Sequence, residues 1–318
     1  MEEQKFFRPE GSDPDGLLLF EDSILLIRNR AGGDSHFNIW SIRQKKNLGP
    51  LLLPGREKNQ SLGFMSYGIY KNKLWVNDIM KNDILHLNID DVRQEKESSA
   101  YPVPTTYYWM QMQNDSIVAM SGDYDSNYKV SLFNIYSGKV INQLIPYSSG
   151  NGTTIPREQK SAYESSLFMK PSGEKCVQAC RYADQIEIMD LNYQLSKIVK
   201  GPEGFEPDVM VVTDITGKEV STRNDDTRFA FVRGKTTNEY IYLLYSGHNH
   251  MSEHRDLGSY LYIYDWEGKP VKKLKFTSDV TDFAVTNDNK TIYAYHPDSR
   301  FIMKSTVVTA VSGAGREN

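Results

Sequence analysis

Three of the six histidines of the chain lie within seven residues, in the segment His248-Asn-His250-Met-Ser-Glu253-His254. Imidazole nitrogens and carboxylate oxygens bind zinc and other divalent ions, and three protein ligands leave one coordination position open. His248, His250 and His254 are therefore candidate metal ligands, and with Glu253 they are candidate ligand-binding residues. Because the spacing matches no fixed zinc template, a solvated hairpin loop stays open as the other interpretation.

Neighbouring aromatic residues form a second candidate site at Tyr108 and Trp109. Flat aromatic faces can stack on sugars and other planar ligands, so both residues are candidate ligand-binding residues. Large aromatic side chains also fill the interfaces between packed sheets. The same two interpretations apply to Trp75, which lies in another apolar segment.

Other patterns with known chemistry fit the sequence poorly. The segment Asp123-Tyr-Asp125-Ser-Asn127 resembles the opening of a calcium-binding loop, but Tyr128 and Asn134 stand where glycine and a bidentate glutamate are needed. The sequence contains neither a G-x-S-x-G nucleophile elbow nor the glycine-rich patterns that bind phosphates. We therefore predict no catalytic residue, and a divalent metal is the one cofactor to consider.

The composition limits the partners and the compartment. The formal net charge of the 318 residues is -4, without the basic stripe that is typical of nucleic-acid binding, so we expect no nucleic-acid partner. No apolar run approaches the roughly 20 residues of a membrane span. The start Met1-Glu-Glu is acidic, unlike a signal peptide. A periplasmic or cell-surface location is expected where a leader has been removed, and a cytoplasmic one where Met1 is the native start.

The elements that would position these residues are short strands joined by tight turns. Between Glu239 and Met303, runs of aromatic and β-branched residues meet at the turn sequences Glu267-Gly268 and Asn287-Asp288-Asn289. Alternating strands and tight turns are typical of an antiparallel meander. Residues 156–163 predict a short helix with proline in its first turn, and residues 201–224 predict an ordered loop over one face.

A unit of four strands recurs along the chain. Its early-strand landmarks lie 45 to 61 residues apart, at Leu18, Met65, Met110, Phe168, Phe229 and Phe283. Such a repeat, with apolar residues on both faces of strands such as YLYIYDW, predicts an all-β six-bladed propeller of four-stranded antiparallel blades. The single domain 1–318 would contain blades at 16–55, 62–104, 106–147, 165–201, 227–277 and 280–308, and residues 3–8 as a ring-closing strand.

The runs YLLYSG, YIYDWEGKPVKKLKF and DFAVTNDNKTIYAY resemble the TolB-like six-bladed propeller family of Bacteroidales. The resemblance covers most of the chain and is most specific over residues 239–303. It implies a six-bladed propeller of a kind that is commonly exported and often lipid-anchored through a leader cysteine. A lipid anchor is accordingly expected here only where a leader has been removed, and the family supplies no ligand or catalytic motif to transfer.

Two functions are consistent with these features. The first is a non-enzymatic binding or scaffolding propeller that recognises a glycan, a peptide or a protein partner on one rim. It is favoured by the missing catalytic motifs and by the long loops 147–166, 201–226 and 247–258. The alternative is a metal-dependent hydrolase of the lactonase type, with its site in the central channel. That enzyme would need carboxylates and amides to converge on the ring axis.

Overall fold

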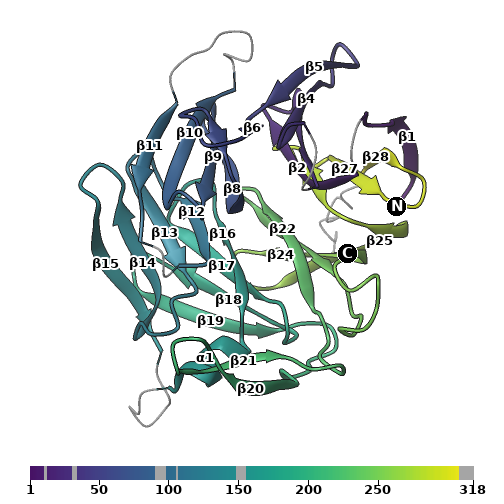
Figure 1. Cartoon of the computed structure of the whole chain (residues 1–318). Helices are drawn as coiled ribbons and strands as arrows, with labels where there is room; N and C mark the ends of the chain where they lie inside the picture. The colour runs from purple at the N-terminus through teal and green to yellow at the C-terminus, as the bar shows by residue number, and fades with distance from the viewer. Residues whose placement is uncertain (11–12, 31–33, 90–97, 105–106, 148–154, 308–318) are drawn as a thin grey trace, which may run out of the picture.

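The computed structural model describes residues 1–10, 13–30, 34–89, 98–104, 107–147 and 155–307 of the chain. Within these residues, six four-stranded antiparallel sheets are arranged as the blades of a ring (Figure 1). The prediction of an all-β six-bladed propeller is therefore confirmed. In the described part of the chain, no helix is long and apolar enough to cross a membrane.

In the first five blades, the strands follow the chain from the inner to the outer edge of each sheet. Blade one consists of β2 (Pro14–Phe20), β3 (Ile24–Asn29), β4 (Phe37–Ser41) and β5 (Lys46–Leu51). Blade two consists of β8 (Phe64–Tyr70), β9 (Lys73–Asp78), β10 (Asp83–Asn88) and β11 (Ser99–Pro102). Blade three consists of β12 (Trp109–Met112), β13 (Ile117–Ser121), β14 (Tyr128–Asn134) and β15 (Lys139–Pro146). Blades four and five consist of β16 (Ser165–Met169), β17 (Lys175–Cys180), β18 (Gln185–Asp190) and β19 (Leu195–Lys200); and β22 (Phe231–Thr236), β23 (Tyr240–Tyr245), β24 (Gly258–Asp265) and β25 (Pro270–Val280).

Blade six combines strands from both ends of the described chain. Its inner three strands are β26 (Phe283–Val285), β27 (Thr291–His296) and β28 (Phe301–Thr306), and its outer strand is β1 (Glu3–Phe7). β1 runs antiparallel to β28, with Glu3 opposite Ser305 and Phe7 opposite Ile302. The ring is therefore closed by hydrogen bonds between segments about 300 residues apart.

Each blade buries both of its faces against its neighbours, as β23 in blade five shows. Tyr242 and Leu244 point into the core that blade five shares with blade six. Ile241, Leu243 and Tyr245 point to the opposite face, into the core shared with blade four. Because successive side chains of a strand alternate between faces, a strand covered on both sides must be apolar at nearly every position.

The turn sequences set where the strands end. Gly268, in the turn between β24 and β25, has a φ angle of +76°, a conformation that L-residues with a side chain rarely adopt. A Cβ atom at this position would lie 2.6 Å from Cγ2 of Val199 in blade four. Glycine is thus required both by the backbone of the turn and by the close approach of the neighbouring blade.

Two short strand pairs and one short helix lie in the connections between blades. β6 (Leu53–Pro54) and β7 (Gln60–Ser61) form a parallel pair after blade one. The predicted helix is confirmed as α1 (Arg157–Ala162), which precedes blade four. The segment predicted as a loop at 201–224 instead contains a hairpin of β20 (Val209–Thr213) and β21 (Glu219–Arg223), because Val209–Thr213 supplies β-branched residues that pair across a tight turn.

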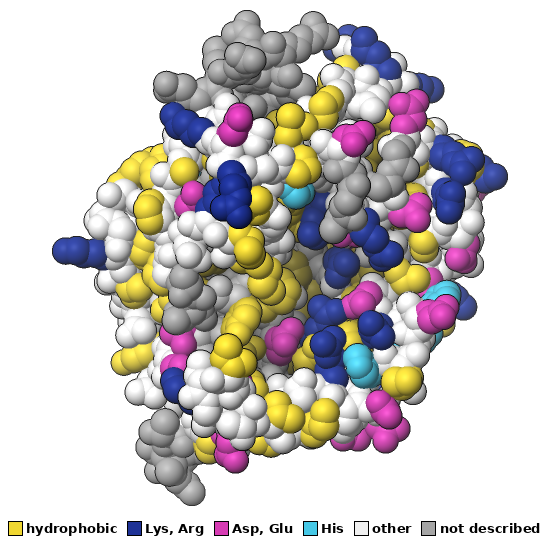
Figure 2. Space-filling model, in the orientation of Figure 1, with side chains coloured by type: hydrophobic (Ala, Val, Ile, Leu, Met, Phe, Trp, Pro, Cys, Tyr) yellow, Lys and Arg dark blue, Asp and Glu magenta, His cyan; other side chains and the backbone are white. Residues whose placement is uncertain are grey.

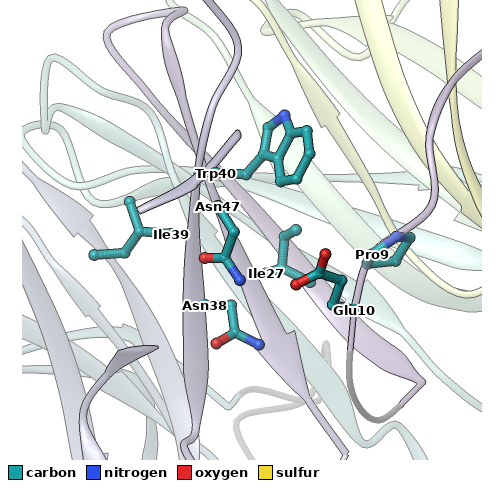
Figure 3. A pocket seen from close by; sticks show the side chains of 7 residues that line it. All are labelled: Pro9, Glu10, Ile27, Asn38, Ile39, Trp40 and Asn47. Atoms are coloured by element: carbon teal, nitrogen blue, oxygen red, sulfur yellow. The ribbon is translucent and has the colours of Figure 1, made fainter. Parts of the chain in front are cut away.

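The end of β1 and the segment after it pack against blade one. The Phe7 ring stacks on Trp40, with ring centroids 3.7 Å apart and an interplanar angle of 4°. Pro9 and Glu10 then lie beside the sheet near Asn38 (Figure 3). The pocket between these side chains has a volume of about 10 Å³, which is room for at most one water molecule. This pocket is a small packing gap beside the ring-closing segment, and it is too small for a ligand.

A buried hydrogen-bonded pair of side chains, Glu3 and His296, holds the closing strand in place. The Glu3 carboxylate lies 2.7 Å from Nε2 of His296 and accepts a hydrogen bond of 2.5 Å from the backbone N–H of Thr277. The Glu3 and His296 side chains are 1% and 3% exposed. Burial alone would raise the pKa of Glu3, but the hydrogen bonds from His296 and Thr277 outweigh it and lower the pKa. Glu3 therefore joins β1 to blades five and six as a carboxylate.

We predict that Glu3→Gln lowers the free energy of unfolding by about 2 kcal/mol near neutral pH, since it weakens hydrogen bonds to a charged group. Because the folded-state pKa of Glu3 is lowered, its contribution is present above the ordinary value of 4.5 and is lost as the pH falls through the folded pKa. Urea unfolding between pH 7 and pH 3.5 should show the wild type and E3Q converging at low pH. The exposed neighbour provides the control, E2Q, which should match the wild type throughout. Equal stability of E3Q and wild type at pH 7 would contradict this role.

Candidate functional site

The inner strands surround a cavity of about 630 Å³ on the axis of the ring, which we call the channel. Neighbouring inner strands contact each other around the whole ring, in the order β2, β8, β12, β16, β22 and β26. All of them contribute residues to the channel wall. In the space-filling view the channel is visible as a hollow near the middle of the face shown (Figure 2).

The wall of the channel has an aromatic half and a charged half. Blades two to four supply its large aromatic side chains, which include Tyr70, Trp109 and Phe168. Blades five, six and one supply charged side chains, namely Arg28, Arg233, Lys235 and Asp282. Figure 2 shows this asymmetry, with hydrophobic side chains along one side of the hollow and lysines and arginines along the other.

Further cations line the channel from positions at or beyond the strand ends, and each has a carboxylate partner. Lys71 pairs with Asp115. Lys170 pairs with Glu174 at 2.5 Å, and Arg181 pairs with Asp256. These carboxylates satisfy the three cations within the protein.

Asp282 joins three blades at the channel wall. One of its carboxylate oxygens, Oδ2, accepts hydrogen bonds from the backbone N–H of Leu17 at 2.8 Å and from Nζ of Lys235 at 3.0 Å. The Asp282 side chain is 1% exposed, and its other oxygen is buried without a hydrogen-bond partner within the described residues. A buried carboxylate needs such a cation, since an unpaired charge of this kind is strongly destabilising.

A second acidic group, Asp15, lies beside the same wall. Oδ1 of Asp15 is 3.5 Å from Nε of Arg28. Burial raises the pKa of Asp15, while the charges of Arg28 and Arg233 act in the opposite direction. The Arg28 guanidinium also lies 4.9 Å from the ring centroids of both Phe64 and Tyr67. These contacts fix Arg28 in position by packing as well as by charge.

Arg233 differs from the other cations of the channel. Its guanidinium donates one hydrogen bond, of 2.8 Å, to the carbonyl of Val232. Among the residues that the structure describes, no carboxylate lies within ion-pair distance of it. Arg233 and Lys235 are two residues apart on β22, so their side chains leave the strand on the same face. Arg28, Arg233 and Lys235 therefore face only two carboxylates, Asp15 and Asp282, and the charged half holds one cation more than it has carboxylates.

Two connections between blades and one loop within blade five form a rim, which we define as residues 155–164, 201–230 and 246–257. Arg157 of α1 binds Asp214 in the β20–β21 turn at 2.9 Å, and the backbone N–H of Ser221 donates to Oγ of Ser161. The rim is thus a connected surface built by hydrogen bonds between segments far apart in the sequence.

The turn that resembles a calcium loop belongs to this network. Asp125 pairs with Lys218 at 2.7 Å and with Arg157 at 3.4 Å. Oδ1 of Asp123 accepts a hydrogen bond from the backbone N–H of Asp125. The Asp125 carboxylate therefore links blade three to the rim, and the Asp123 carboxylate supports the turn that carries it.

The candidate histidines lie on the rim, between β23 and β24. The structure brings His248 and His254 to one carboxylate oxygen, Oδ2 of Asp279, at 3.7 Å and 2.9 Å. The backbone N–H of Phe229 donates to the carbonyl of His248 at 2.8 Å, which holds this loop against the inner end of blade five.

The other two candidates in this loop point elsewhere. The His250 ring stacks on Phe229, with centroids 6.2 Å apart, and Glu253 is exposed without joining the histidines. In the described parts of the chain, no group of three or more His, Cys, Asp and Glu side chains is arranged to hold a metal ion. A metal-binding role of His248, His250 and His254 stays a prediction.

The two aromatic candidates are placed differently. Trp109 is half-buried and lines the channel, whereas Tyr108 is 48% exposed and stacks near Tyr124 at a centroid distance of 6.1 Å. Trp75, which also lines the channel, is fully buried in the core between blades two and three. A ligand-binding role of Tyr108 and Trp109 likewise stays a prediction.

Sequence reasoning missed the charged half of the channel. Arg28 and Arg233 are about 200 residues apart and meet only because the ring closes. A signal was present, since Arg233 and Lys235 interrupt an apolar stretch, FVRGKT, at the start of blade five. Charges on a strand that packs on both faces indicate a place where the strand borders a cavity.

Comparisons with known proteins give the fold family. A family model described as TolB-like 6-blade propeller-like matches residues 17–288. No curated protein sequence matches the chain.

Several solved structures are similar in fold. A member of the duf4221 family from Bacteroides vulgatus aligns with a TM-score of 0.62 at 9% identity, covering 96% of each chain. Hydrazine synthase from Kuenenia stuttgartiensis aligns with a TM-score of 0.52 at 11% identity, covering 95% of this chain and 97% of that one. The β-propeller domain of Cps50 (Swd1) from Myceliophteria thermophila aligns with a TM-score of 0.50 at 12% identity, covering 96% of this chain and 100% of that one. At such low identities the likeness concerns the fold alone.

We predict that Lys235 and Asp282 are strongly coupled in stability. Lys235→Met and Asp282→Asn should each lower the free energy of unfolding by about 3 kcal/mol, since each leaves a largely buried charge without its partner. The double variant should lose less stability than the two single variants lose together. Urea unfolding of the four proteins should give a coupling energy of about 1–3 kcal/mol. The matched control is the exposed pair of Lys71 and Asp115, whose cycle should give less than about 1 kcal/mol. Equal coupling in the two cycles would show that the channel pair has no special role.

Proposed function

The chain belongs to the TolB-like 6-blade propeller-like family, and we propose that it is a non-enzymatic binding propeller that takes a glycan, a peptide or a protein partner at the channel mouth. The observation that carries this proposal is the channel itself. Its volume of about 630 Å³ lies within the roughly 300–1,000 Å³ of ligand pockets in proteins. A mixed wall of aromatic and charged side chains is also typical of ligand sites.

The rim supports recognition of a larger ligand at the same face. Its segments are tied to each other by Arg157, Asp214 and Ser221, and the histidine loop is tied to Phe229. A surface that is already ordered loses less conformational entropy when a partner binds. A glycan, peptide or protein that enters the channel could therefore extend over the rim.

The charges of the channel do not favour the hydrolase alternative. A lactonase-type site needs several carboxylate or amide oxygens directed at one cation. Here Asp282 already accepts two hydrogen bonds, and Asp15 lies beside Arg28. Arg28, Arg233 and Lys235 would repel a divalent ion at this position. The arrangement is suited to binding rather than to metal-assisted hydrolysis.

We predict that filling the channel abolishes binding without unfolding the protein. Gln111 lines the channel from β12, and the structure shows no hydrogen bond of its side chain within the described residues. Gln111→Trp should therefore occupy channel space. The matched control is Gln143→Trp, on the exposed surface of the outer strand β15.

The measurement is binding of labelled protein to a glycan array and a peptide array. We expect ligands that bind the wild type and Q143W but not Q111W, and that are recovered unchanged after prolonged incubation. Ligands that Q111W still binds would place recognition outside the channel. Conversion of a bound ligand to products would identify an enzyme instead.

A further inference from the structure

We propose that the channel binds an acidic saccharide, whose carboxylate pairs with Arg233 and whose sugar ring lies against Phe168 and Trp109. This inference rests on the proposed function, because it names the ligand class of the same channel. Three features of the wall carry it: the unpaired guanidinium, the aromatic side chains that line the same channel and uncharged polar groups without partners.

The charge balance of the wall calls for an anion. Arg28 and Lys235 each have an aspartate partner, whereas no described carboxylate pairs with Arg233. A guanidinium beside other cations in a recessed site is repelled by them and is poorly compensated by water. A ligand carboxylate would remove that imbalance.

The geometry of Arg233 is suited to a carboxylate. A guanidinium presents parallel N–H donors that bind the two oxygens of a carboxylate at once. One hydrogen bond of Arg233 goes to the Val232 carbonyl, which fixes the side chain and leaves other donors available. Lys235 leaves β22 on the same face, so a second cation lies close to the expected anion.

An aromatic surface lines the same channel on the other face of β22. Gly234 stands between Arg233 and Lys235 and faces the opposite way, so that a Cβ atom there would lie 2.6 Å from the Phe168 ring. The missing side chain therefore makes room for Phe168 against the strand. Trp109 lines the channel one blade further on, from β12. The flat faces of sugar rings stack on aromatic side chains, whereas a small inorganic anion would gain nothing from them.

Uncharged polar groups complete the fit to a saccharide. Gln111, Ser166 and Asn287 line the channel, and the structure shows no side-chain hydrogen bond for any of them within the described residues. Amides and hydroxyls can both donate and accept hydrogen bonds, as sugar hydroxyls do. A carboxylate on a hydroxyl-rich ring therefore matches the wall better than a simple anion or an apolar ligand.

The test is calorimetric titration with disaccharides of galacturonate, glucuronate and mannuronate, each compared with its neutral carboxyl-reduced form. We expect at least one acidic disaccharide to bind, and its reduced form to bind roughly tenfold to a hundredfold more weakly. Arg233→Gln should weaken the acidic form by a similar factor and leave the reduced form nearly unchanged. Trp109→Leu should weaken both forms. The control, Arg43→Gln, replaces an exposed arginine in the turn after β4 and should bind like the wild type.

Thermal unfolding of each variant checks that it is folded. Arg233→Lys provides a second variant that keeps the charge but loses the planar fork, so it should bind the acidic form with intermediate affinity. Equal binding of acidic and reduced forms, unchanged binding by both Arg233 variants, or no binding of any acidic disaccharide would overturn the inference. The proposed function is tested independently of these results, by whether Q111W loses binding of the array ligands.

Discussion

Each blade of this protein has two apolar faces, and no blade can cover both of them alone. Tyr242 and Leu244 of β23 need blade six, while Ile241 and Leu243 of the same strand need blade four. Every sheet therefore depends on a neighbour at each side, and an open row of blades would leave its two end faces in water. Closure of the ring removes those end faces, and the remaining architecture follows from this requirement.

The chemistry of the channel is a product of the same closure. Inner strands from different blades border one cavity, so side chains distant in the sequence share one electrostatic environment. Asp282 illustrates the connection, because its carboxylate binds β2 and Lys235 and so supports the wall while setting its charge. Asp15 pairs with Arg28 and Asp282 pairs with Lys235, so Arg233 is the cation of this group that is available to a ligand. Structure and recognition thus depend on one set of charges.

The fold was largely predictable, and the channel was not. Turn sequences such as Glu267-Gly268 and strands that are apolar on both faces indicated a propeller, because these signals are local. Among the candidate site residues, His248 and His254 were noticed because they are close in sequence, and the structure does bring them together at Asp279. His250 packs on Phe229 instead, since the loop turns between them. Convergence of Arg28 with Arg233 depends on the diameter and closure of the ring, which no local pattern contains.

The closing strand also has a consequence for the order of folding. In an unfolded chain, pairing Glu3 with Ser305 would close a loop of about 300 residues, at an entropic cost of roughly 5 kcal/mol. After the intervening blades have formed and packed, the same two strands are separated only by the gap between neighbouring blades. By then the contacts between the blades have already offset most of the loop-closure entropy. We therefore expect β1 to pair with β28 late in folding. Folding should accordingly proceed from local meanders to one long-range event that completes them.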